Sequence, residues 1–206
     1  MKTERKRNRW GKLYTGLCAF FIVGEIMLVL FSWLLSATMQ EGVRSLMSAE
    51  GLRWFLGGFT TMLASPKLIW LLLFAMAGGC VWKSGLLTLS FRSLLWGFRQ
   101  RVALMTSLLI LIIYIAVVMM LTAVPHAALL SATGQLFPSP FSRALVPLFT
   151  FGVMLTAVAY GWASGHYKSL TDVVSSWSWG VGWAAPLLVL YVLFVQFELS
   201  LRFVFT

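Results

Sequence analysis

Five long apolar stretches occupy most of this sequence and restrict it to folds that lie within a membrane. A helix that crosses the hydrocarbon core needs about 20 residues, and about 17 are tolerated. Because lipid offers no hydrogen-bonding partner, every backbone polar group must be paired within its own segment, as in an α-helix. The sequence therefore predicts an all-α, polytopic membrane protein, with transmembrane helices at about residues 14–37, 66–82, 102–124, 144–162 and 178–197.

Composition supports the lipid bilayer as the solvent and main partner of this chain. Hydrophobic residues make up 60% of the 206 residues, and charged residues only 11%. A soluble domain of this size could not hide so much apolar surface from water. We expect residues 14–206 to form a single membrane domain, preceded by a basic cytoplasmic tail at residues 1–13.

The basic residues are distributed as a topology signal. The net charge is +10, and the positive residues concentrate in the tail and in the 83–101 loop, whereas the other loops are nearly balanced. Positive residues favour the cytoplasmic side. We therefore expect the N-terminus inside, the C-terminus outside, and the 163–177 loop inside. The basic tail is interpreted as contacting anionic lipid headgroups, and nucleic-acid binding is not expected.

Two amphipathic segments, at residues 42–63 and 83–101, predict interfacial helices that lie along the membrane surface. In the first, Trp54 is expected at headgroup depth, and Ser169-x-x-Asp172 resembles a capping box that starts the last helix. Small residues permit close approach of membrane helices. The glycine pairs at 57–58 and 78–79 and the glycines at 180 and 182 predict such contacts. The wide apolar faces further predict a homo-oligomer, most simply a homodimer.

Glu25 is the acidic residue that lies near the middle of a span. Placing an ionised acid at mid-bilayer costs about 2.5–3.5 kcal/mol on insertion scales. No Lys or Arg lies at matching depth in another span, so the acid requires a proton or a polar partner. Glu25 is therefore a proton-coupling or ion-binding residue, or a neutral carboxyl bonded to a neighbouring hydroxyl or carbonyl.

The remaining polar residues have simpler interpretations. Glu198 and Arg202 have the i,i+4 spacing of a surface ion pair. His126 and His166 lie in opposite loops without metal-ligand spacing, and the two cysteines have no CxxC pattern. Motifs for ATP hydrolysis, zinc chemistry and acyl transfer are absent. The sequence predicts no catalytic, cofactor-binding or metal-binding residue, and no enzymatic activity.

Two groups of sequence passages carry a family resemblance. The first, at residues 43–87, contains VRSLMSAEGLRWFL and, after a span, KSGLL. The second, at residues 138–197, contains PSPFSRALVPLF, YGWASGHYKSLTDVV and LVLYVLFVQF. In this order the passages resemble the p-aminobenzoyl-glutamate transporter (AbgT) family of bacterial secondary transporters. The resemblance covers most of the chain after residue 40, and it implies the same topology in a bacterial inner membrane.

The resemblance also implies what this sequence lacks. A sequence segment similar to the family's first re-entrant hairpin is missing between Arg92 and Arg99, and the sequence ends before the segment that corresponds to the second hairpin. Those hairpins hold the substrate and cation sites in the family, so no substrate-binding residue can be carried over. The chain thus resembles an internally deleted and C-terminally truncated member.

Three functions follow from this combination. The first is transport of p-aminobenzoyl-glutamate or a related small aromatic amide, with ion or proton coupling, by an oligomer or with a membrane partner that supplies the missing transport core. The second is a non-transporting membrane scaffold that binds a partner. The third is a non-functional remnant of a transporter.

Overall fold

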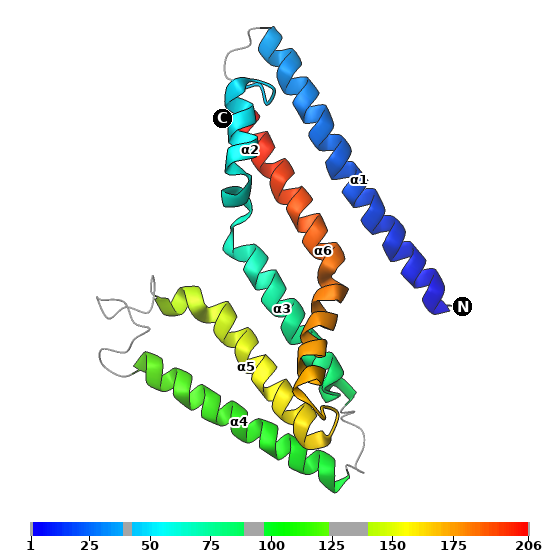
Figure 1. Cartoon of the computed structure of the whole chain (residues 1–206), viewed down its shortest axis with the longest axis vertical. Coiled ribbons are helices and arrows are strands. Elements are labelled where there is room, and N and C mark those ends of the chain that lie inside the picture. Colours follow the sequence, from blue (N-terminus) through cyan, green and yellow to red (C-terminus); the bar gives the residue numbers. More distant parts are fainter. Residues whose placement is uncertain (1, 39–42, 89–96, 124–139, 206) are drawn as a thin grey trace. The chain divides into compact units, whose positions relative to one another are not determined.

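The computed structural model describes residues 2–38, 43–88, 97–123 and 140–205, and these contain helices and no strand (Figure 1). The all-α prediction is therefore confirmed. A short 3₁₀ turn, Leu86–Thr88, accompanies six α-helices: α1 (Lys2–Ala37), α2 (Ala49–Leu63), α3 (Pro66–Lys83), α4 (Phe98–Ala123), α5 (Pro140–Ser164) and α6 (Leu170–Phe205).

Five helical segments of the described chain are long and apolar enough to cross a membrane, as the sequence predicts. They are Gly11–Ala37, Ala49–Lys83, Phe98–Thr122, Arg143–Ser164 and Leu170–Phe205. The helices extend beyond the predicted apolar stretches, because hydropathy marks only the part of a helix that lies in lipid. Helix α1 begins within the basic tail, and α6 begins before its apolar stretch and continues past it.

The two predicted amphipathic helices have different outcomes. The first is helical as α2, and the second lies mostly at residues 89–96, outside the described part of the chain.

Contacts divide the chain into two compact units. The first unit comprises Met1–Ile69 and Ala185–Thr206, and the second comprises Trp70–Ala184. Helices α3 and α6 each contribute one part to each unit. The two units are described separately below.

In the first unit, the C-terminal part of α6 packs against both α1 and α2 (Figure 1). Phe197 of α6 lies 5.8 Å, between ring centroids, from Phe21 of α1, and a Cβ atom on Gly24 would come within 3.1 Å of the Phe197 ring. On the other side of α6, Phe203 stacks on Trp54 of α2 at 4.5 Å. Large aromatic contacts of this kind carry much of the packing energy between helices.

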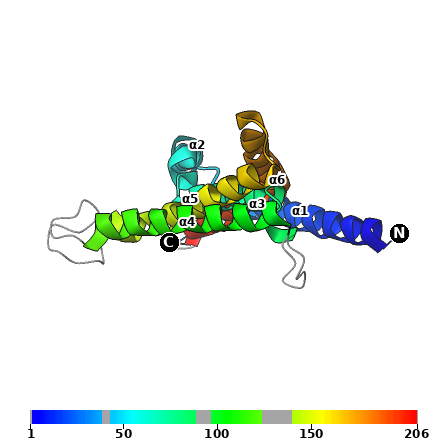
Figure 2. The ribbon, with the colours of Figure 1, turned by 90° about the horizontal axis from the view of Figure 1, so that it is seen from below.

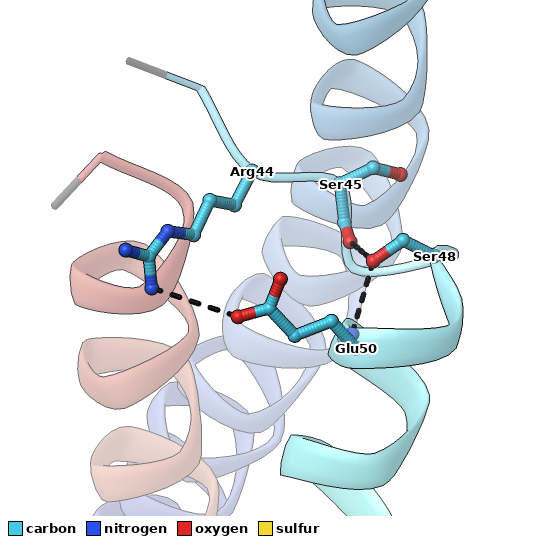
Figure 3. A network of polar contacts seen from close by, with 5 residues as sticks. Arg44, Ser45, Ser48 and Glu50 are labelled. Atoms are coloured by element: carbon cyan, nitrogen blue, oxygen red, sulfur yellow. Dashed lines mark hydrogen bonds and ion pairs between the residues drawn. The ribbon is translucent and has the colours of Figure 1, made fainter.

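A polar network fixes the start of α2 (Figure 3). Ser48 is the N-cap, and its hydroxyl oxygen accepts the backbone N–H of Gly51 at 3.0 Å. The same hydroxyl donates to the carbonyl of Ser45 at 2.7 Å. Arg44 and Glu50 approach to 3.9 Å with both side chains exposed, so this ion pair contributes little. The N-cap serine supplies the principal local stabilisation, typically about 1 kcal/mol.

Backbone hydrogen bonds connect this network to its neighbours. The N–H of Arg44 donates to the carbonyl of Val204 at the end of α6, at 3.0 Å, and the N–H of Leu46 donates to the Ser32 hydroxyl of α1, at 3.2 Å. Leu46, Val204 and Leu28 form the buried apolar cluster of this unit. The segment that precedes α2 therefore joins the ends of three helices.

In the second unit, α3 and α6 cross at a pair of glycines. A Cβ atom on Gly79 would lie 2.8 Å from Cα of Gly180, and one on Gly180 would lie 2.9 Å from Cα of Gly79. The predicted close approach is therefore confirmed at these two residues. It is wrong for Gly57, Gly78 and Gly182, where no described atom lies within 4 Å of the added Cβ, because these glycines are on other faces of their helices.

Helices α4 and α5 of the same unit lie side by side (Figure 1 and Figure 2). The Tyr114 hydroxyl of α4 donates to the Leu148 carbonyl of α5 at 2.7 Å, and the Tyr114 ring covers Gly152. Pro147 leaves the α5 ladder short of one N–H. The Tyr114 hydroxyl therefore bonds to the carbonyl of the residue that follows this proline.

The connection from α5 to α6 supports the expected capping box in part. The carboxylate of Asp172 accepts the N–H groups of Lys168 and Ser169 at 2.9 and 3.0 Å. The Ser169 hydroxyl contacts Thr171 instead of completing the reciprocal bond. Gly165 has φ +82°, a conformation that favours glycine. The turn is thus fixed by one carboxylate and one glycine.

We predict that Gly79→Ala or Gly180→Ala lowers the free energy of unfolding by about 1–3 kcal/mol, because the new methyl group overlaps the backbone of the facing helix. Gly78→Ala and Gly182→Ala are matched controls and should be neutral, or stabilising by up to about 1 kcal/mol. Denaturation by SDS in mixed micelles measures the difference. An equal loss in all four variants would contradict the crossing.

Candidate functional site

Glu25, the mid-span acid, contacts two polar side chains of α6 within the first unit. The Ser200 hydroxyl donates to Oε1 of Glu25 at 2.6 Å, and the Gln196 amide nitrogen donates to Oγ of Ser200 at 3.4 Å. Ser200 is fully buried and Gln196 is 8% exposed. These three residues form a polar cluster, which we call the Glu25 cluster, inside an otherwise apolar contact between α1 and α6.

Helix geometry places the cluster. Gln196 and Ser200 are four residues apart, so their side chains lie one above the other on the same face of α6. Phe197 of α6 packs over Gly24, the residue that precedes Glu25. This close approach brings α1 near enough for the short Ser200 side chain to reach the carboxyl group.

The cluster is incompletely paired. Oε2 of Glu25 and Oε1 of Gln196 are buried and have no hydrogen-bond partner among the described residues. In the described chain, no Lys, Arg or His lies within ion-pair distance of Glu25. The sequence left open a carboxyl bonded to a neighbouring hydroxyl, and Ser200 is that hydroxyl.

Sequence reasoning singled out Glu25 but not its partners. Gln196 and Ser200 are polar residues at i,i+4 spacing near the end of a long apolar helix. That spacing was a usable signal for a buried polar face. It could not indicate which helix the face would meet.

The other polar candidates have local roles. The Glu198–Arg202 ion pair is confirmed at 2.5 Å. His166 contacts the Ser164 hydroxyl at 2.9 Å in the α5–α6 turn, and His126 lies outside the described residues. No group of three or more His, Cys, Asp or Glu side chains that could hold a metal ion occurs within the described ranges.

A second buried polar cluster, in the second unit, joins α3 to the α5–α6 turn and the start of α6. The Tyr167 hydroxyl donates to the Cys80 carbonyl at 3.1 Å, and the Cys80 thiol lies 3.4 Å from the Ser176 hydroxyl. Burial raises the pKa of Tyr167, so the phenol remains a neutral donor. Cys80 and Ser176 are fully buried. The hydrogen bonds of this cluster connect α3 to the start of α6. Its three side chains are buried, so none of them is an accessible reactive group.

An apolar cavity of about 540 Å³ opens among α3, α5 and α6 within the second unit. Trp82 and Trp179 stack along it with ring centroids 6.1 Å apart. The volume lies in the range of small-molecule pockets, about 300–1,000 Å³. None of the described residues that line the cavity is charged. This described lining suits an aromatic ring or a lipid chain and offers no charge that would neutralise a carboxylate. Its principal lining residues are Phe74, Trp82, Phe149, Thr150, Trp179 and Trp183.

The five long apolar helical segments of the described chain, with a half-buried acid in the middle of one of them, define a multi-pass membrane protein. A family model described as the AbgT putative transporter family matches residues 97–202, just over half of the chain. The chain belongs to this family, and it is therefore a transporter-like membrane protein. Neither a curated protein nor a solved structure gave a match.

We predict that Ser200→Ala lowers the free energy of unfolding by about 1–3 kcal/mol, because Oε1 of Glu25 loses its hydrogen-bond donor within the contact between α1 and α6. Ser178→Ala is the matched control on the same helix. The Ser178 side chain is exposed and bonds only to its own helix, at the Val174 carbonyl, so its loss should cost less than about 0.5 kcal/mol. SDS denaturation in mixed micelles compares them, and equal losses would contradict the Glu25–Ser200 contact.

Proposed function

We propose that this chain takes part in transmembrane transport of p-aminobenzoyl-glutamate, or of a related small aromatic amide, across a bacterial inner membrane. The observation that carries the proposal is the match of residues 97–202 to a transporter family. The ordered passages at residues 43–87 and 138–197 support the substrate class, because they resemble the p-aminobenzoyl-glutamate transporters.

Glu25 is the residue through which transport would be coupled to protons or ions. Ionisable residues within membrane spans are costly, and they commonly mark ion or proton pathways. The carboxyl group accepts a hydrogen bond from Ser200 at 2.6 Å, and its second oxygen has no partner in the part of the chain that the structure describes. A group that changes its protonation or ligand state needs such a free oxygen.

Transport would require more than one copy of the chain, or a second membrane protein. A p-aminobenzoyl-glutamate molecule combines an aromatic amide with two carboxylates. The cavity in the second unit suits the aromatic part, but none of its described lining residues is cationic. A homodimer, or a partner that supplies the transport core, would provide the missing charges.

The orientation follows from charge. The concentration of basic residues in the tail and in the 83–101 loop supports a cytoplasmic N-terminus and an external C-terminus. The loop between α5 and α6 would then be cytoplasmic.

A non-transporting membrane scaffold is the second function that a specific observation favours. Among the described residues, the lining of the cavity is apolar apart from Thr150, so it suits a lipid chain as well as an aromatic ring. A remnant without function is the remaining alternative, and the transport experiment below separates it from transport.

We predict that cells lacking other routes take up or export labelled p-aminobenzoyl-glutamate only when this chain is present, with saturable kinetics. Glu25→Gln should reduce the movement at least about tenfold, because the variant cannot exchange a proton. Glu198→Gln is the matched control, since Glu198 is paired on the surface of α6, and it should retain the wild-type rate. Absence of movement despite membrane insertion would overturn the transport proposal.

We predict that two exposed positions lie on opposite sides of the membrane, and cysteines introduced there can test this. The test uses a variant in which Cys18 and Cys80 are replaced, so that only the introduced cysteine reacts. A membrane-impermeant maleimide added outside the cell should label Arg53→Cys in α2. It should not label Lys168→Cys in the α5–α6 turn until the membrane is opened. The reversed pattern would overturn the proposed orientation.

A further inference from the structure

The hydrogen bonds of the Glu25 cluster run in one direction. The amide nitrogen of Gln196 can only donate, and it does so to Oγ of Ser200 at 3.4 Å. The single hydroxyl proton of Ser200 is directed to Oε1 of Glu25 at 2.6 Å. Every donor in this chain of bonds therefore points toward the carboxyl group.

The Glu25 cluster has fewer hydrogen-bond donors than acceptors. Oε2 of Glu25 and Oε1 of Gln196 are both buried acceptors without a partner among the described residues. Native proteins pair nearly all such atoms, so an unpaired set calls for a ligand or an explanation. A group that pairs these oxygens is either a donor, such as a proton on the carboxyl group or a water molecule, or a cation.

No side chain of the described residues supplies the missing charge. The charged groups at the end of α6, Glu198 and Arg202, pair with each other on its surface. In and before α2, Glu50 pairs with Arg44. On α1, Lys12 is more than three turns away from Glu25. An ionised Glu25 would thus be an uncompensated charge inside an apolar contact, which is strongly unfavourable.

The number of oxygen atoms available in the Glu25 cluster favours a proton over a metal ion as the bound species. Hard cations such as Ca²⁺ take about six to eight oxygen ligands, whereas this cluster offers two free acceptor oxygens. Helical carbonyls nearby are already bonded within their helices. A proton needs only one oxygen to carry it, and it converts that acceptor into a donor.

We infer that Glu25, Ser200 and Gln196 form a proton-binding site, in which Oε2 of Glu25 carries the proton while Ser200 and Gln196 hold the carboxyl group in place. Proton binding forms one O–H bond on the carboxylate, and release returns the proton to water. The inference deepens the proposed function and rests on it only for the role of the proton in transport. Ser200 and Gln196 are positioning residues.

Infrared spectroscopy of the purified full-length protein in lipid vesicles tests the site without any substrate. At neutral pH, we expect a carbonyl band of a protonated carboxylic acid that Glu25→Gln removes. Glu198→Gln is the matched control and should leave the band in place. Raising the pH should abolish the band reversibly. A Glu25 band already ionised at neutral pH would overturn the inference.

The positioning residues give a second readout that a purely structural role would not move. In Ser200→Ala, the ionised carboxylate loses its hydrogen-bond donor and becomes less favourable. The band of the protonated acid should therefore persist to a pH at least about one unit higher than in the wild type. Ser200→Thr restores the hydroxyl and should restore the titration midpoint. Gln196→Leu removes the amide that donates to Ser200, so it should also shift the pH midpoint of the Glu25 titration. Gln100→Leu, at the exposed start of α4, is the control and should leave this midpoint unchanged. Unchanged midpoints in Ser200→Ala and Gln196→Leu would contradict their positioning role.

Replacing choline chloride by sodium chloride separates a proton from a metal ion. The inference expects no effect on the band at neutral pH, and ionisation of Glu25 by sodium would overturn it. The outcomes for site and transport are distinguishable. A titrating Glu25 band without substrate movement would retain the proton site and reject the proposed function, and the converse result would reject the site alone.

Discussion

The requirement that lipid places on the backbone determines the architecture of this protein. Because a bilayer offers no hydrogen-bonding partner, each crossing segment must satisfy its own N–H and C=O groups. The described chain does so with helices alone, five of them long enough to cross. Polar side chains between such helices are therefore costly exceptions, and they are the places where function is most reasonably sought.

The described helices pack against one another through two different kinds of contact. At the α3–α6 crossing, Gly79 and Gly180 let two backbones approach so closely that no side chain fits between them. The α1–α6 contact combines the packing of Phe21 on Phe197 with a half-buried Glu25, whose carboxyl group accepts a hydrogen bond from Ser200. The first contact fixes packing, whereas the second keeps an ionisable group and a free oxygen inside the protein.

Hydropathy predicted the five helical segments that are long and apolar enough to cross a membrane, because that signal is local and strong. The helix ends were less predictable: α6 continues to Phe205 because the helical backbone does not stop where lipid does. Glu25 could be singled out from the sequence, but Ser200 could not be named as its partner. The two residues are far apart in the chain, and their contact depends on how α1 packs against α6. For the same reason, Gly79 could not be distinguished from Gly78 in advance.

The central claim is that a proton on Glu25 is linked to movement of an aromatic amide. The most direct measurement is proton flux into vesicles containing the purified chain, driven by a gradient of p-aminobenzoyl-glutamate. The account predicts flux that requires the substrate gradient, persists in Glu198→Gln and disappears in Glu25→Gln. Substrate movement without proton flux, or equal proton flux in wild type and Glu25→Gln, would contradict it.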